Sequence, residues 1–237
     1  MRSRRYNLST GIEESTMKNT SLFRTIIAFL TVVFVTSCAQ VINDFTIQPP
    51  AQPGMELFVD DFDPPSKGWG TMSQEEGVVG FGYGGMVFAI EHPETILWSV
   101  NGKQLTNSRI DVDAILVDGS ADDFFGVVCR YQDDDNFYGF LVSHDGYFGI
   151  LKYQDGEMEI MMEDGNLSFS EAINRGAAFN RIQVLCNGEV LSLSVNDTQL
   201  VEIEDGSFSS GKIGLMAGTN EDEGVMVLFD NLAVYQP

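Results

Sequence analysis

Residues 124–157 read FFGVVCRYQDDDNFYGFLVSHDGYFGILKYQDGE and predict three consecutive antiparallel strands. The expected strands cover residues 124–132, 137–143 and 147–154, and Asp, Asn and Gly fill the turns between them. These turn residues tolerate positive φ at little steric cost, whereas β-branched and aromatic residues favour strands. Aromatic side chains occur on both faces of the strands, so we expect a sandwich with one partly exposed aromatic face.

Similar segments continue through the rest of the body. Residues 108–117, SRIDVDAILV, alternate strictly, which directs the apolar side chains to one face and Asp111 and Asp113 to the other. The pair Asn187-Gly188 lies between two further apolar segments and predicts a hairpin. About a dozen such strands and no sustained helical period predict an all-β antiparallel sandwich, with one helical turn expected within residues 168–178.

The N-terminal segment has the pattern of an export signal. Lys18 and Arg24 are basic, residues 26–35 are apolar, and Val35-Thr36-Ser37-Cys38 ends the pattern. The apolar run is too short for a transmembrane helix, which needs about 20 residues. The pattern resembles a bacterial lipoprotein signal, which implies cleavage before Cys38 and a diacylglycerol group on its sulfur. We therefore expect a signal peptide over residues 1–37, with Met17 as the true initiator.

This signal predicts the organisation and location of the mature chain. Residues 38–55 would form a flexible tether, because their prolines and Gly54 favour an extended chain. Residues 56–237 would form one domain. A multiply acylated Cys38 would anchor the protein stably in a membrane. We expect a lipid-anchored protein of the bacterial cell envelope that faces the extracytoplasmic side.

The body of the chain is strongly acidic. The whole chain has a formal net charge of −22, and without residues 1–37 it keeps 8 basic and 33 acidic side chains, a net charge of −25. Phosphate binding needs clustered Lys and Arg, so the composition argues against nucleic acid and anionic lipid as partners of the body. Cations, uncharged ligands and basic proteins remain as partners, and a high negative charge also serves solubility alone.

Six short motifs fall in the order found in concanavalin A-like jelly-roll domains. They are Asp60-Asp61-Phe62, Gly68-Trp69, Cys129-Arg130-Tyr131, Asp145-Gly146-Tyr147, Ser210-Gly211-Lys212-Ile213-Gly214-Leu215 and Phe229-Asp230-Asn231. From Leu57 to Tyr235 the chain resembles the laminin-G-like or 3-keto-disaccharide hydrolase-like modules of bacterial secreted and lipid-anchored proteins. The resemblance implies an antiparallel two-sheet jelly-roll sandwich. Lectins, adhesion modules, glucanases and spacers share this fold, so the resemblance does not imply one activity.

The resemblance also implies a structural Ca²⁺ and a disulfide. Many domains of this class hold one calcium ion with oxygen ligands where the first and last strands meet, and Asp60, Asp61 and Asp230 match those positions. The alternative for Asp230 is a carboxylate that faces water at an edge or caps a turn. Cys129 and Cys186 lie at inward positions of their strands, which suits either two buried thiols or a bridge. The resemblance favours the bridge.

An aromatic surface on the central strands would suit a carbohydrate. Sugar sites use aromatic rings that stack on the apolar face of the sugar, with polar side chains nearby for the hydroxyl groups. The residues that could supply such a surface are Trp98, Arg130, Tyr138, Tyr147 and Tyr153. The alternative is that these rings pack in the core or across neighbouring strands.

A catalytic site is not evident in the sequence. Glycosidases of this fold carry alternating carboxylates on one strand, and neither residues 157–164 nor the pair Asp111 and Asp113 matches that pattern. The chain has two histidines, which supply a triad or a metal site poorly. We therefore expect a non-catalytic lipoprotein that binds a glycan or an envelope partner. The alternatives are an enzyme acting on a polysaccharide and a structural spacer without a small ligand.

Overall fold

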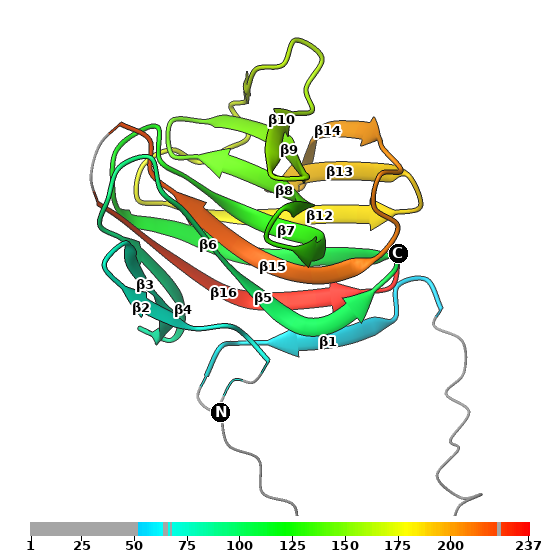
Figure 1. Ribbon diagram of the computed structural model, residues 1–237, viewed down its shortest axis with the longest axis horizontal. Coiled ribbons are helices and arrows are strands. Elements are labelled where there is room, and N and C mark those ends of the chain that lie inside the picture. The colour runs from blue at the N-terminus through cyan, green and yellow to red at the C-terminus, as the bar shows by residue number, and fades with distance from the viewer. Residues whose placement is uncertain (1–51, 64–65, 67, 222–223) are drawn as a thin grey trace, which may run out of the picture. The chain divides into compact units, whose positions relative to one another are not determined.

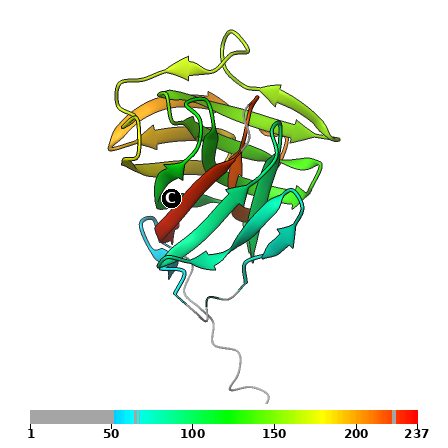
Figure 2. The same ribbon diagram turned by 90° about the vertical axis from the view of Figure 1, so that its left-hand side faces the viewer.

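The computed structural model describes residues 52–63, 66, 68–221 and 224–237. Within these residues sixteen β-strands form two antiparallel sheets, and no helix is long and apolar enough to cross a membrane. Figures 1 and 2 show the two sheets packed face to face. The predicted signal peptide, Cys38 and nearly all of the predicted tether lie outside the described residues.

The larger sheet contains nine strands in the described part of the chain. Its order is β14-β13-β12-β6-β16-β4-β3-β2, and β1 pairs with the second half of β16. The first and last strands of the sandwich are therefore neighbours (Figure 1). The strands are β1 (Glu56–Asp60), β2 (Met72–Gln74), β3 (Gly77–Gly82), β4 (Gly85–Ile90), β6 (Ser108–Asp118), β12 (Phe179–Asn187), β13 (Val190–Val195), β14 (Thr198–Glu204) and β16 (Val225–Tyr235).

The smaller sheet holds the three strands predicted from residues 124–157. Its order is β10-β9-β8-β7-β15-β5, and β11 also pairs with β9. The strands are β5 (Ile96–Leu105), β7 (Phe124–Asp133), β8 (Asn136–Ser143), β9 (Tyr147–Gln154), β10 (Glu157–Ile160), β11 (Ser168–Phe169) and β15 (Gly211–Gly218). The predicted all-β two-sheet sandwich is confirmed.

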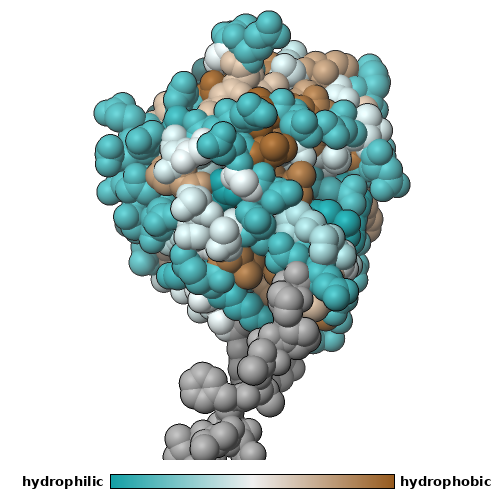
Figure 3. Space-filling model, turned by 90° about the vertical axis from the view of Figure 1, so that its right-hand side faces the viewer, coloured by the Kyte–Doolittle hydropathy of each residue, from teal (hydrophilic) through white to brown (hydrophobic). Residues whose placement is uncertain are grey.

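The core between the sheets follows the alternation in the sequence. The apolar side chains of β6, which are Ile110, Val112, Ala114 and Leu116, are buried, as the strict alternation of residues 108–117 predicts. They pack in one apolar cluster with inward side chains of the smaller sheet, such as Phe140 of β8. Removal of this apolar surface from water is the main force that holds the two sheets together. A face of the molecule seen in Figure 3 is largely hydrophilic with small hydrophobic patches.

The helical turn expected within residues 168–178 is wrong. The segment forms the short strand β11 followed by turns. The side chain of Asn180 explains the difference, because it bonds to the backbone of Asn174 on both sides. Asn174 N donates to Asn180 Oδ1 at 2.8 Å, and Asn180 Nδ2 donates to Asn174 O at 2.9 Å. Such side-chain bonds offer the backbone an alternative to helical bonds.

Candidate ligand-binding face

The outward face of the seven-stranded sheet is apolar. Residues paired directly across β5, β15, β7, β8 and β9 form the row Val100, Gly214, Val128, Gly139 and Leu151. Val128 and Leu151 belong to a second apolar cluster that is separate from the core between the sheets. A solvated outer face of an antiparallel sheet is normally polar. Here Val128 and Leu151 are 0% and 2% exposed, so this apolar layer is covered by neighbouring side chains, and its partly buried members are the ones that a ligand can reach.

Glycines on this face leave room for large neighbouring side chains. A Cβ atom on Gly139 would lie 2.6 Å from Leu151 Cδ1 and 3.0 Å from Met216 Sδ. A Cβ atom on Gly149 would lie 2.6 Å from Leu167 Cδ2. All three separations are below van der Waals contact. The leucine and methionine side chains therefore occupy the space above these glycines and form an apolar floor.

Four aromatic rings gather at one end of this floor. We call Trp98, Tyr131, Phe137 and Tyr153 the aromatic patch. The Phe137 ring is buried at the centre, and its centroid lies 4.6 Å from that of Tyr153, 5.4 Å from that of Trp98 and 5.8 Å from that of Tyr131. The three outer rings are half-buried. Packing against Phe137 fixes their orientation and leaves part of each ring open to solvent.

A carboxylate joins two of these rings. Asp134 Oδ1 accepts a hydrogen bond from Trp98 Nε1 at 3.2 Å and another from the Tyr131 hydroxyl. Burial, the hydrogen bond to Asp134 and the negative charge of Asp134 together raise the pKa of Tyr131 to about 12. Tyr131 therefore stays protonated at neutral pH and holds Asp134 beside the exposed ring faces.

The structure brings together two of the five residues predicted to contact a ligand. Trp98 and Tyr153 both belong to the aromatic patch. Tyr147 lies at the edge of the sheet, where its ring meets that of Phe169 at 5.6 Å. Sequence reasoning missed Tyr131, Phe137 and Asp134 as members of the patch. Asp134 lies in a run of three aspartates, which such reasoning assigns to a solvated turn.

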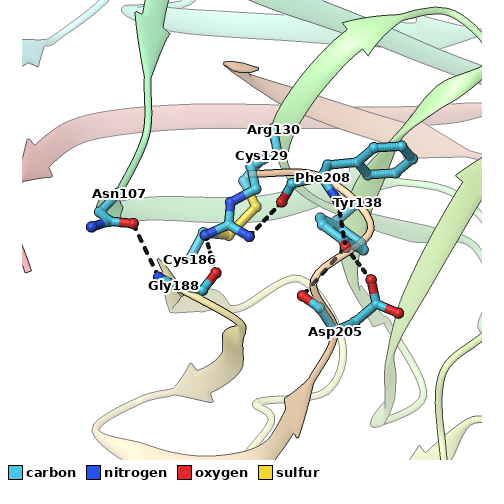
Figure 4. The surroundings of a disulfide bond; sticks show 8 residues. All are labelled: Asn107, Cys129, Arg130, Tyr138, Cys186, Gly188, Asp205 and Phe208. Carbon is cyan, nitrogen blue, oxygen red and sulfur yellow. Dashed lines mark hydrogen bonds between the residues drawn. A yellow bond between two sulfur atoms is a disulfide. The ribbon is translucent and has the colours of Figure 1, made fainter. Parts of the chain in front are cut away.

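Arg130 and Tyr138 lie inside the protein, which removes them from the predicted ligand surface. Their exposed fractions are 2% and 0%. Arg130 Nη1 donates to Phe208 O at 2.6 Å and Nη2 donates to Gly188 O at 2.5 Å (Figure 4). Arg130 has a φ of 51° at a break in the register of β7 with β8, and this bulge turns its side chain inward. Its two bonds tie β7 to the β12–β13 hairpin and to the loop before β15.

The predicted disulfide between Cys129 and Cys186 is confirmed. Both residues are fully buried, and they are 57 positions apart in the chain. Cys129 lies on β7 of one sheet and Cys186 on β12 of the other, so the bond joins the two layers. Arg130 lies next to the bond in Figure 4. The bond and Arg130 therefore fix the same end of the sandwich.

A polar network holds the loop that follows β14. Asp205 accepts hydrogen bonds from the Tyr138 hydroxyl and from Ser207 N, and its Oδ2 lies 3.3 Å from Lys152 Nζ. Burial of Asp205 opposes ionisation, but these hydrogen bonds outweigh it and lower the pKa of Asp205 to about 2. Burial and the contact with Asp205 raise the pKa of Tyr138 to about 12. The network is structural and lies on the inner side of the sheet.

Replacing Asp205 by asparagine should remove a pH-dependent part of the stability. A carboxylate whose pKa is lowered by folding stabilises the folded state fully above its unfolded pKa of about 3.9, and this part is lost as the pH falls through about 2. We expect Asp205→Asn to lower the free energy of unfolding by about 2 kcal/mol at pH 7, with a smaller difference at pH 2.5. Urea unfolding at both pH values measures this. Asp197→Asn, at an exposed turn, is the matched control. An equal loss at both pH values would contradict the assignment.

The predicted calcium ligands have other contacts. Asp60 Oδ1 accepts from Phe62 N at 2.8 Å, Asp60 Oδ2 accepts from Trp69 Nε1 at 2.9 Å, and Ser66 Oγ lies within 3.0 Å of both oxygens. Asp61 is exposed, and Asp230 Oδ1 accepts from the adjacent backbone N–H. Among the described residues, no three His, Cys, Asp or Glu side chains are grouped to hold a metal. A calcium ion here stays a prediction and would depend on further oxygen ligands.

Known proteins resemble this chain in structure and not in sequence. No family model matches the chain, and a search of curated proteins finds no match. The carbohydrate-binding module CBM66 from Bacillus subtilis is similar with a TM-score of 0.58 and 15% identity, covering 73% of this chain and 98% of that one.

Two further structures have similar scores. A Bacillus subtilis protein of unknown function with a galectin-like fold has a TM-score of 0.58 at 11% identity, covering 78% of this chain and 97% of that one. A Bacillus licheniformis β-glucanase has a TM-score of 0.56 at 9% identity, covering 78% of this chain and 100% of that one. At such identities the likeness shows the fold alone. The domain is a concanavalin A-like two-sheet jelly-roll sandwich.

Proposed function

We propose that this domain is a non-catalytic carbohydrate-binding module whose ligand lies on the aromatic patch. The observation that carries the proposal is the fixed arrangement of Trp98, Tyr131 and Tyr153 around Phe137, with Asp134 held beside them. Rings with one open face stack on the apolar face of a sugar. Asp134 can accept hydrogen bonds from hydroxyl groups, and Lys212 Nζ, 5.8 Å from the Tyr131 ring centroid, can donate them.

Solved structures of the same fold include a carbohydrate-binding module and a β-glucanase, which supports a glycan as the ligand. The floor of the face supports binding without hydrolysis. Glycosidases place two carboxyl groups about 5–9.5 Å apart across the scissile bond. Along the middle of β7, β8 and β9 the outward positions instead hold glycine or apolar side chains, such as Val128, Gly139 and Leu151.

The location that we propose rests on the N-terminal sequence. Lys18, Arg24, the apolar residues 26–35 and Cys38 support export and lipidation of the cysteine. Residues 38–55 would then connect the lipid to the sandwich. A glycan of the cell surface or of the surroundings would be within reach of a domain anchored in this way.

Alanine at Trp98 or at Tyr153 should weaken glycan binding about tenfold, because a lost stacking contact of about 1.4 kcal/mol corresponds to that factor. The variant with alanine at both Trp98 and Tyr153 should bind the glycan about a hundredfold more weakly. Isothermal titration against a panel of soluble uncharged polysaccharides measures the change. Phe179→Ala is the matched control, since Phe179 is 59% exposed on the outward face of the other sheet.

Other outcomes of the same panel favour the alternatives. Release of reducing ends that is lost on substitution of a carboxylate would establish an enzyme. A folded domain that binds none of the polysaccharides would favour a spacer or a protein partner. Equal losses in Phe179→Ala and Trp98→Ala would remove the aromatic patch as the site.

A further inference from the structure

A second binding feature adjoins the aromatic patch. A pocket of about 340 Å³ opens on the same outward face. Its walls come from β5, β7, β8, β9, β10 and the following loop. The main wall residues are Ile96, Phe124, Leu141, Leu151, Ile160 and Leu167. We call this hollow the aliphatic pocket.

The aliphatic pocket and the aromatic patch form one surface. Ile96, Phe124, Leu141, Leu151 and Leu167 belong to the same cluster of contacting side chains as Trp98, Phe137 and Tyr153. Phe137 and Leu141 are four residues apart on β8, which corresponds to about 13 Å along an extended strand. One ligand molecule can therefore contact both.

The chemistry of the pocket differs from that of the patch. A sugar hydroxyl buried without a hydrogen-bond partner costs roughly 1–3 kcal/mol. The isoleucine and leucine side chains of the wall offer no such partner, and the polar lining residues Glu94, Asp122 and Asn220 are exposed and lie outside the strands. Thr219 Oγ1 is already hydrogen-bonded to His92 O and Thr95 N. Phe124 supplies the one aromatic ring among the lining residues that the structure describes. Each buried CH₂ group, by contrast, contributes about 0.8 kcal/mol. The lining therefore favours an aliphatic chain over a further sugar unit.

The polar groups that line the pocket disfavour a ligand with a negative charge. Glu94 and Asp122 contribute two carboxylates to the lining, and Asn220 and Thr219 contribute neutral groups. No Lys or Arg lines it among the residues that the structure describes, and the body of the chain has a net charge of −25. A fatty acid or an anionic lipid headgroup would be repelled, whereas an uncharged molecule would not.

We propose that the glycan ligand of this domain carries an aliphatic acyl or alkyl chain, and that this chain occupies the aliphatic pocket. The inference rests on the proposed function, because it places the sugar on the aromatic patch. The domain would then recognise an uncharged glycolipid or an acylated glycan in preference to the bare sugar.

Alkyl glucosides test the inference. Methyl, n-hexyl and n-octyl β-D-glucopyranoside, each below its micelle concentration, carry one sugar and chains of increasing length. We expect the affinity of octyl glucoside to exceed that of methyl glucoside at least tenfold, which corresponds to about two buried CH₂ groups. Octanoate, with the carboxylate and no sugar, should bind more weakly than octyl glucoside.

A charge beside the alkyl chain should reduce the affinity that the chain contributes. Met158 lines the pocket and is 53% exposed, so Met158→Glu should fold and should lower the octyl-to-methyl affinity ratio. Val117→Glu is the matched control, because Val117 is 50% exposed on the other sheet, and its ratio should stay unchanged. With ¹³C-methyl methionine, the Met158 signal should shift with octyl glucoside, and that of Met226, on the other sheet, should not.

The outcomes separate this inference from the proposed function. If polysaccharides bind at the aromatic patch but chain length adds nothing, the inference is overturned and the proposed function stands. If octyl glucoside shifts Met158 while Trp98→Ala changes no affinity, the pocket stands and the proposed function fails. An equal loss of the ratio in Val117→Glu would also overturn the inference.

Discussion

Replacing Cys129 and Cys186 together by alanine is expected to lower the free energy of unfolding by about 4 kcal/mol. The bond closes a loop of 57 positions, and opening it enlarges the set of conformations open to the unfolded chain. It also joins β7 to β12 across the core, so its loss removes a covalent link between the two sheets. Urea unfolding of the oxidised protein and of the double alanine variant measures the difference.

The buried position of the bond allows a second test, which is its resistance to a reductant. Both cysteines are inaccessible to solvent, so a reductant should not open the bond in the folded protein. In the presence of a reductant, the bond should therefore be reduced only at the urea concentrations at which the protein unfolds. A loss of stability below about 1 kcal/mol in the double variant would contradict a stabilising role for the bond.

The Arg130→Met variant is expected to lose about 3 kcal/mol, because one buried and one partly buried carbonyl group would each lose a charged hydrogen bond. These are Phe208 O and Gly188 O, bonded at 2.6 and 2.5 Å. Burial lowers the pKa of Arg130, which shows that the interior opposes the charge. Methionine relieves that cost, so the loss is smaller than two full bonds. Unfolding by urea measures it.

Arg175→Met is the control for this prediction. The Arg175 side chain is 56% exposed and its contact with Glu171 spans 3.8 Å, so the substitution should change stability by less than about 0.5 kcal/mol. Equal effects of the two substitutions would show that the bonds of Arg130 do not hold the hairpin and the loop.

Strand alternation predicted most of the fold. It predicted the inward side chains of β6 and the inward positions of Cys129 and Cys186. The Asn187-Gly188 pair predicted the turn between β12 and β13. These features depend on neighbouring residues of one strand or one turn, which a single sequence displays.

The candidate site could not be predicted from strand alternation, because a β-bulge at Arg130 interrupts the alternation. Regular alternation from the inward Cys129 would place Arg130 outward and Tyr131 inward. The positive φ of Arg130 reverses both, so Arg130 is buried and Tyr131 joins the aromatic patch. The sequence also does not show which of Phe137 and Tyr138 faces outward. Both faces of β8 are buried, so its residues are apolar or aromatic on both sides.

The proposed binding site is tested most directly by NMR of the two tryptophan indoles. The chain has two tryptophans, and they report on different places. Trp98 Nε1–H lies at Asp134 in the aromatic patch, whereas Trp69 Nε1–H is bonded to Asp60 at a buried position. Trp98→Phe assigns the two signals in a ¹⁵N spectrum. On titration with the polysaccharide panel, we predict that a binding glycan shifts the Trp98 signal and leaves Trp69 in place. A glycan that saturates the domain while the Trp98 signal stays still would contradict binding at the aromatic patch.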